Sequence, residues 1–319
     1  IRRGPPRHEP PGRPPMSNAL VPASGPAAPG PAVPGLAAPQ LAQLPPRISQ
    51  FATPNYRVTL GRSLRSELRK ILTLPSLRWT LIIGTLFSLA ITALTAWGSS
   101  ELELNTYATA MGAEHSLAAY VLISASSIFQ IIMVAFGAVT VCSEYAANTM
   151  RSTVSADPRR WRNVAARTLA LSLVALATSL LLLVLGAVVG TLFGLTIGFS
   201  GDAWWLFLNF IIAMVTSAWM ALGIGYLLRS SAGTIVLILA VMMLSPVLAL
   251  IPSEFVRTFV IPYLPPMLLT AALSPPGLNA GADVASFTVS SPALGLGLWC
   301  ALAVVLLALG GWRFSRSDV

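Results

Sequence analysis

Charged side chains are scarce in this sequence. Only 10 % of its 319 residues are charged, against roughly 25 % in ordinary globular domains. Hydrophobic residues make up 55 %, and the mean hydropathy is +0.74. This composition excludes a typical soluble protein. The formal net charge of +9 comes from short basic segments between apolar runs, which indicates membrane topology signals and no nucleic-acid partner.

The residues that usually carry catalysis are equally scarce. Lys70 is the only lysine and follows Arg69 instead of a glycine, which excludes a Walker A phosphate loop. The two histidines form no H-E-x-x-H motif, and Cys142 and Cys300 lie far apart, which disfavours a disulfide framework or an ordinary zinc site. We therefore expect no catalytic, cofactor or metal site on this chain.

The first 55 residues have a different composition from the rest. Residues 1–55 are rich in Pro, Ala and Gly and show no apolar periodicity. Proline fixes φ and removes backbone donors, so this stretch cannot build a packed core. We predict a disordered cytoplasmic tail, followed by a membrane domain over residues 56–319.

A short amphipathic segment precedes the first long apolar run. Apolar residues recur in it at three- and four-residue spacing: Leu60, Leu64, Leu68 and Ile71. The charged residues of the same segment are Arg62, Arg65, Glu67, Arg69 and Lys70, and its three arginines fall on the opposite side. A basic amphipathic helix next to a membrane span is typical of the cytoplasmic interface. We predict an interfacial helix here.

Six apolar runs are long enough to predict transmembrane helices. They cover residues 78–98, 117–142, 164–198, 204–228, 232–251 and 293–312. The third is long enough to tilt or to break near Gly190 or Gly194. The fold class predicted is therefore an all-α integral membrane protein of six spans.

The loops between these runs alternate in charge. Basic residues follow the second, fourth and sixth runs, whereas the loop after the first run carries three glutamates and no basic residue. The positive-inside rule then places both termini in the cytoplasm and makes the span count even. We expect the protein in the cell membrane. The external loop 252–292 is rich in Pro and apolar residues, which predicts short re-entrant helices.

The loop after the second run, within residues 142–171, is short, polar and basic, and two interpretations of it stay open. It either docks on a cytosolic partner or only orients the two flanking spans. Composition alone favours the second interpretation.

A family resemblance favours the first interpretation. The helix before the first span contains Ser66-Glu67-Leu68-Arg69-Lys70. The second span is followed by the segment Glu144 to Met150, in which Asn148 stands where the family has a glycine. The third span is preceded by Pro158-Arg159. The run LLRSSAGTIVL lies before the fifth span, and a basic stretch ending in Asp318 closes the chain. In this order and placement, residues 56–319 resemble the permease subunits of ABC-2 type exporters.

The resemblance implies a non-catalytic subunit. It implies two permease chains, identical or different, around a translocation path in the lipid bilayer, each docked on a separate ATP-binding-cassette ATPase that holds the ATP. The loop after the second span would be the coupling element. The residues implied for that contact are Glu144, Tyr145, Thr149, Arg151, Ser152 and Arg159.

Two other functions stay open from the sequence. One is a structural or regulatory membrane protein without transport activity, in which charge reversal at Arg159 should have little effect. The other is a membrane-embedded, lipid-modifying enzyme, although the external acidic residues show no spacing of a metal site. The small-residue-rich, uncharged spans favour lipophilic or amphipathic cargo.

Overall fold

The described part of the chain is helical and built for a bilayer. The computed structural model describes residues 59–104, 114–147, 159–198, 203–274 and 291–316, and these stretches contain no β-strand. Five helical segments are long and apolar enough to cross a membrane: α2 (Pro75–Glu101), the pair α4 (Glu114–Ile123) and α5 (Ser126–Ala146), α7 (Arg160–Leu192), α8 (Ala203–Leu228) and α13 (Pro292–Arg316). At about 1.5 Å per residue, each exceeds the roughly 30 Å hydrocarbon layer. The protein is therefore an all-α, multi-pass membrane protein.

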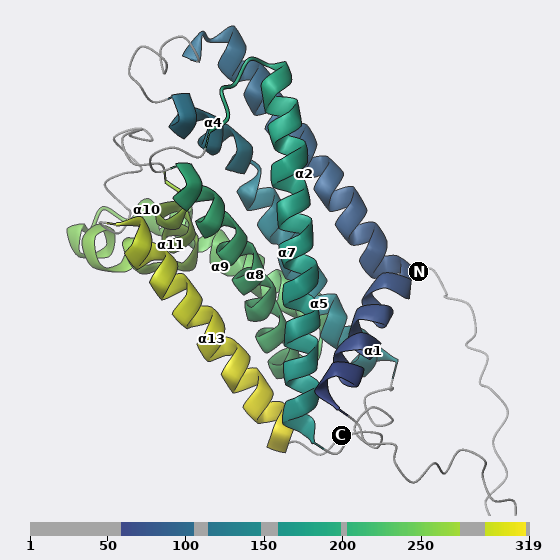
Figure 1. Ribbon diagram of the computed structural model, residues 1–319. Coiled ribbons are helices and arrows are strands. Elements are labelled where there is room, and N and C mark those ends of the chain that lie inside the picture. Colours follow the sequence, from purple (N-terminus) through teal and green to yellow (C-terminus); the bar gives the residue numbers. More distant parts are fainter. Residues whose placement is uncertain (1–58, 105–113, 148–158, 199–202, 275–290, 317–319) are drawn as a thin grey trace, which may run out of the picture. The chain divides into compact units, whose positions relative to one another are not determined.

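Helix α8 lies at the centre of the bundle. It packs most extensively against α13 and α5, and then against α7 (Figure 1). Its most apolar stretch is 72 % buried inside the protein, against 28 % for α2 and for α7. An apolar helix that is mostly covered by other helices forms the core, and the helices around it present one face outward.

Small residues let the central helices approach closely. A Cβ added at Gly137 of α5 would meet the backbone carbonyl of Ala218 on α8. A Cβ at Gly223 of α8 would meet the backbone of Leu306 on α13, and one at Gly310 would meet Gly223. Small residues at helix contacts are the usual way for membrane helices to bring their backbones together.

The outer faces of α2 and α7 are apolar and exposed. On α2, Ile83, Leu86 and Phe87 are 61 %, 60 % and 54 % exposed, and on α7 Val184 and Val188 are 60 % and 57 % exposed. A continuous apolar surface of this kind is unusual on a soluble monomer. It is the surface that lipid tails cover.

The third predicted span breaks where glycine permits it. Helix α7 ends at Leu192, and Gly194 adopts a φ of 78°, in the left-handed region that favours glycine. Of the two positions predicted for a break, the structure selects Gly194.

The fifth predicted span differs from the prediction of one helix over 232–251. The chain forms α9 (Ser231–Met242) and α10 (Leu244–Ala249), separated by a turn at Met243. A proline at 246 disfavours an uninterrupted helix, because its ring clashes with the carbonyl four residues earlier, at the end of α9. Twelve residues rise only about 18 Å, so α9 alone does not match a full span, and the count of six remains a prediction.

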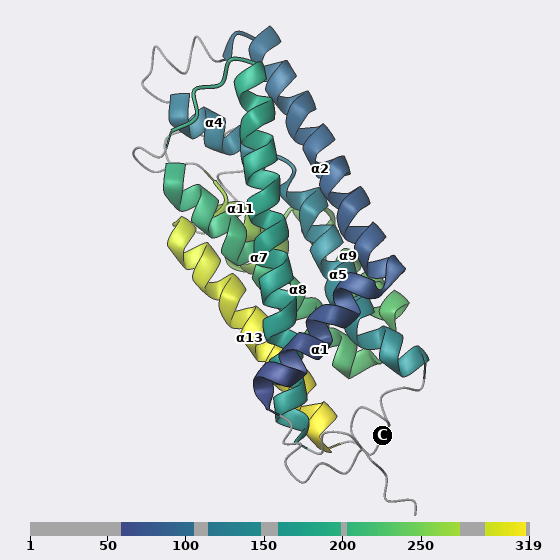
Figure 2. The same cartoon turned by 45° about the vertical axis from the view of Figure 1, so that its right-hand side comes forward.

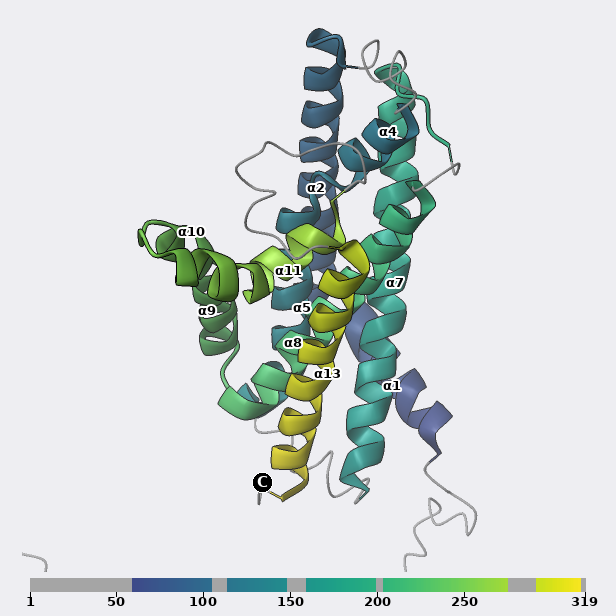
Figure 3. The ribbon, with the colours of Figure 1, turned by 90° about the vertical axis from the view of Figure 1, so that its left-hand side faces the viewer.

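A series of short helices follows α10. It consists of η2 (Val256–Val260), η3 (Ile261–Tyr263) and α11 (Pro265–Ala272). In Figure 3, α9, α10 and α11 lie on one side of α8 and α13. Short helices were predicted for the loop 252–292. The structure has them as far as Ala272, residues 275–290 lie outside the described residues, and the depth of these helices in the membrane remains a prediction.

The amphipathic helix α1 (Leu60–Thr73) packs against the bundle. Thr59 caps its N-terminus by accepting a hydrogen bond from the Arg62 backbone N–H at 3.4 Å. Ile71 is buried, and Leu64 and Leu68 pack against the same core. The helix contacts α7 and α2 and crosses α7 in Figure 2. Most of the apolar face that predicted a contact with lipid is thus covered by the protein itself.

Candidate coupling site

Four charged side chains meet at the end of the bundle predicted to face the cytoplasm. Glu67 and Lys70 lie one turn apart on α1, Glu144 lies in the last turn of α5, and Arg167 lies in the second turn of α7. The i, i+3 spacing puts Glu67 and Lys70 on one side of α1. Because α1 packs on α7, that side meets the other two charges.

The four side chains form a closed ring of ion contacts. Lys70 Nζ lies 2.7 Å from Glu67 Oε1 and 2.8 Å from Glu144 Oε1. Arg167 Nε lies 3.1 Å from Glu67 Oε2, and Arg167 Nη2 lies 2.6 Å from Glu144 Oε2. The Arg167 to Glu144 contact is the shortest of the four ion contacts. Each carboxylate therefore bridges both cations.

The ring is buried and electrically neutral. The side chains of Arg167, Glu67 and Glu144 are 1 %, 7 % and 12 % exposed, and that of Lys70 is 38 % exposed. Two carboxylates and two cations cancel, which is the arrangement that makes buried charge tolerable. The Arg167 Nη1 also faces the Tyr226 hydroxyl of α8 at 3.5 Å. The ring thus connects α1, α5 and α7 and contacts the central helix.

The ring raises the pKa of Lys70, its most exposed member. Burial by itself lowers the pKa of the Lys70 amine, but its hydrogen bonds to Glu144 and Glu67 and the charges of both carboxylates outweigh burial and raise that pKa above 10.5. Lys70 is therefore a cation throughout the physiological range.

A second polar contact connects Tyr145 to the start of α9. The Arg229 guanidinium lies 5.4 Å from the centre of the Tyr145 ring, within the range of a cation–π contact. Arg229 has a φ of 56°, an uncommon conformation for a residue other than glycine. It occupies the short link between α8 and α9, so Tyr145 connects the end of α5 to that link.

The start of α7 and the end of α13 form a basic hollow. The Arg160 guanidinium donates to the backbone carbonyls of Phe314 and Ser315, both at 3.2 Å, and so binds the last turn of α13. The hollow measures about 860 Å³ and is lined by Leu60, Arg159, Arg160, Trp161, Arg162 and Ser315. Arg159, predicted for the ATPase contact, is exposed here.

The predicted site residues thus fall into four groups. Glu67, Lys70 and Glu144 meet in the ring, while Tyr145 and Arg159 lie at the same end of the bundle in the two contacts described above. Arg62, Arg65 and Arg69 lie exposed on α1. The remaining predicted coupling residues, Thr149, Arg151 and Ser152, lie outside the described residues.

Arg167 is the residue that sequence reasoning missed. It was counted only among the basic residues that follow the second span, yet the structure buries it completely inside α7. The signal was its position within the apolar stretch NVAARTLAL, several residues beyond the arginines that suffice to orient the helix. A charge inside an apolar run usually has a partner and a role.

Comparison with protein-family models and with curated proteins gave no match for this chain.

Proposed function

We propose that this chain is the membrane-spanning permease subunit of an ATP-binding-cassette exporter, coupled to a separate ATPase through the segment that follows α5. Two such chains enclose the translocation path, and ATP is held on the partner ATPase. The single observation that carries the proposal is the ring of Glu67, Lys70, Glu144 and Arg167. It joins the interfacial helix before the first span to the end of the second span, where the segment that the family resemblance implies for coupling begins.

The ring suits the transmission of movement between helices. Glu144 is too deeply buried to serve mainly as a surface contact, since its side chain is 12 % exposed and bridges Lys70 and Arg167. A force applied beyond α5 reaches α1 and α7 directly through these ion contacts. Withdrawing Glu144 would leave Lys70 and the buried Arg167 to share Glu67 alone, and this uncompensated positive charge is costly.

An external motor is consistent with the residues that the chain offers. The sequence has no Walker A lysine, and among the described residues no three His, Cys, Asp or Glu side chains are grouped to hold a metal. The described charges concentrate at one end of the bundle, and the helices that would enclose a path are apolar. Transport against a gradient through such a path would draw its energy from another chain.

The first test is affinity purification of the tagged full-length chain from native membranes in mild detergent. We expect a stoichiometric soluble protein with a Gly-x-x-x-x-Gly-Lys loop to copurify. Recovery of the chain alone, or only with unrelated membrane proteins, would contradict the proposal and favour a structural or regulatory role.

A charge reversal locates the docking surface. Arg159→Glu should reduce copurification of the ATPase roughly tenfold, which corresponds to about 1.4 kcal/mol, because Arg159 is exposed beside the basic hollow. Arg257→Glu is the matched control, because Arg257 is also exposed but lies beyond α10, on the side predicted to be external. Equal ATPase recovery with both variants at equal membrane abundance would exclude this surface as the docking site.

A further inference from the structure

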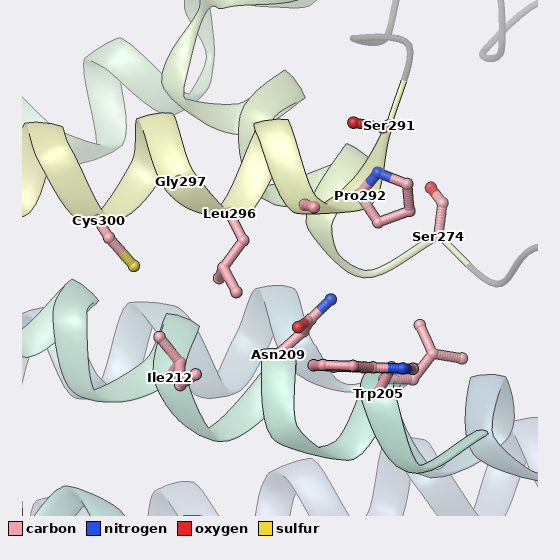
Figure 4. A pocket seen from close by; sticks show the side chains of 11 residues that line it. Trp205, Asn209, Ile212, Ser274, Ser291, Pro292, Leu296, Gly297 and Cys300 are labelled. Carbon is pink, nitrogen blue, oxygen red and sulfur yellow. The ribbon is translucent and has the colours of Figure 1, made fainter. Parts of the chain in front are cut away.

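A cavity of about 500 Å³ opens between the N-terminal halves of α8 and α13. On α8 it is lined by Trp205, Asn209 and Ile212, at the i, i+4, i+7 spacing of one helix face. On α13 the lining residues also share one face: Ala293, Leu296, Gly297 and Cys300. Figure 4 shows these two faces opposite each other, with Ser274 and Ser291 at one end. A cavity of this volume is the size of a small-molecule site.

The packing of the two helices explains why space remains here. Near their other ends, α8 and α13 touch through backbone atoms at Gly223 and Gly310. Between that contact and the cavity, the indole of Trp299 donates to the Thr216 hydroxyl at 3.0 Å. Helix α11 then packs against α13 at Gly295, where a Cβ would meet Ala271. The cavity is bounded by these contacts and is a property of the helix packing.

The lining has a polar end and an apolar end. Asn209 is 7 % exposed, and its amide donates to the Ala272 carbonyl at 2.8 Å, but its Oδ1 accepts no hydrogen bond from the described residues. The Ser291 hydroxyl accepts from the Leu294 N–H at 3.3 Å and retains its proton for another acceptor. Beyond Asn209 the lining is aliphatic, ending at Cys300. None of the eleven lining residues is charged.

We infer that this cavity binds an uncharged, hydroxyl-bearing amphipathic molecule, of which a monoacylglycerol is a model. The hydroxyl donates to Asn209 Oδ1 and accepts from Ser291, while the hydrocarbon lies between Ile212 and Leu296. Asn209 is an acceptor on the cavity wall, so a molecule whose hydroxyl donates to it binds better than a plain hydrocarbon. A carboxylate has no proton to give and finds no cation in the lining. The inference rests on the proposed function in that the bound molecule represents the class of cargo that the exporter would carry.

The test uses the full-length chain, without the ATPase, in phosphatidylcholine nanodiscs. The probe is a monoacylglycerol that carries a diazirine in its palmitoyl chain. After irradiation, the labelled peptides are identified by mass spectrometry. We expect saturable labelling of α8 around Asn209 and of α13 around Leu296. Unlabelled monopalmitoylglycerol should compete, and palmitate should compete roughly tenfold more weakly, which corresponds to about 1.4 kcal/mol.

A cavity-filling variant with a matched control tests the location. A Cβ at Gly297 has no atom within 4 Å, so Gly297→Leu adds a side chain at the cavity without forcing the backbone to move. Gly98→Leu makes the same change in α2, where a Cβ also meets nothing within 4 Å. Saturable labelling should fall about tenfold in Gly297→Leu and stay unchanged in Gly98→Leu.

Three results would overturn the inference. The first is labelling that does not saturate and is as strong on the exposed residues Val304 and Val305 as at the cavity, which indicates bulk lipid contact only. The second is equal competition by palmitate, which indicates an unselective apolar surface. The third is no labelling at all, as expected if another part of the chain or a second copy fills the cavity. Because no ATPase is present, failure here is distinct from failure of the purification test.

Discussion

Removal of Arg167 should destabilise the protein more than any other single change in the ring. Arg167→Met replaces the guanidinium with an unbranched apolar side chain and leaves Glu67 and Glu144 with Lys70 alone, so the ring carries a net charge of −1. Two unit charges whose centres lie about 4 Å apart attract each other by on the order of 4 kcal/mol at an effective dielectric of ~20, before the cost of desolvation. Breaking a buried pair by removing one partner typically costs about 3–5 kcal/mol.

The stability of the purified protein in detergent is the measurement. A loss of about 3–5 kcal/mol lowers Tm by roughly 6–20 °C in a protein of this size class. Arg65→Met is the control, because Arg65 is exposed on α1, and surface changes of this kind usually stay within about 0.5 kcal/mol.

A double substitution separates charge balance from packing. Arg167→Met combined with Glu144→Gln leaves one carboxylate and one ammonium, so the ring is neutral again. If charge balance stabilises the ring, the double variant is more stable than the sum of the two single losses predicts, by at least about 2 kcal/mol. Losses that simply add would refute the ring as an electrostatic unit and leave only side-chain packing.

Three further predictions test individual contacts. The folded-state pKa of Lys70 is raised above 10.5, so its contribution to stability is fully present below pH 10.5 and is lost as pH rises through the raised pKa. When Tm is measured at a series of alkaline pH values, Lys70→Arg should lose less stability over that interval than the parent chain. Gly310→Leu should lower the free energy of unfolding by at least about 1–3 kcal/mol, because its Cβ would overlap the backbone of Gly223, whereas Gly98→Leu should not. Arg160→Ala removes the donors to the last turn of α13, so amide hydrogen exchange in that turn should become faster. Unchanged exchange would show that these hydrogen bonds do not stabilise the C-terminal end of α13.

The long helices were predictable because the signal is local. A run of apolar residues longer than the bilayer is thick has few alternatives to a spanning helix. The structure accordingly has long helical segments at five of the six predicted runs. Most of their ends lie within a few residues of the predicted ends. The prediction of one continuous helix over 232–251 was wrong, because hydropathy carries no information about breaks in the backbone. The proline at 246 was visible in the sequence, but its apolar neighbours concealed its effect.

The ring was only partly predictable, since its contacts join distant parts of the chain. The i, i+3 pairing of Glu67 with Lys70 could be read from helical spacing. The Lys70 to Glu144 contact joins residues 74 apart in sequence and depends on how α1 packs on α7 and α2. Arg167 was assigned to the loop because topology rules count loop arginines without asking which of them are buried. The coupling role of the ring stays a proposal.

The position of Glu144 decides how a movement beyond α5 would spread. Its carboxylate contacts Lys70 of α1 and Arg167 of α7 at the same time. If the end of α5 moved away, both cations would lose the same carboxylate. A displacement that keeps all four contacts must carry α1 and α7 together with α5. The Arg167 to Tyr226 contact links this group to α8. Since α8 also forms one wall of the amphiphile cavity near its other end, it is the one described helix in contact with both sites.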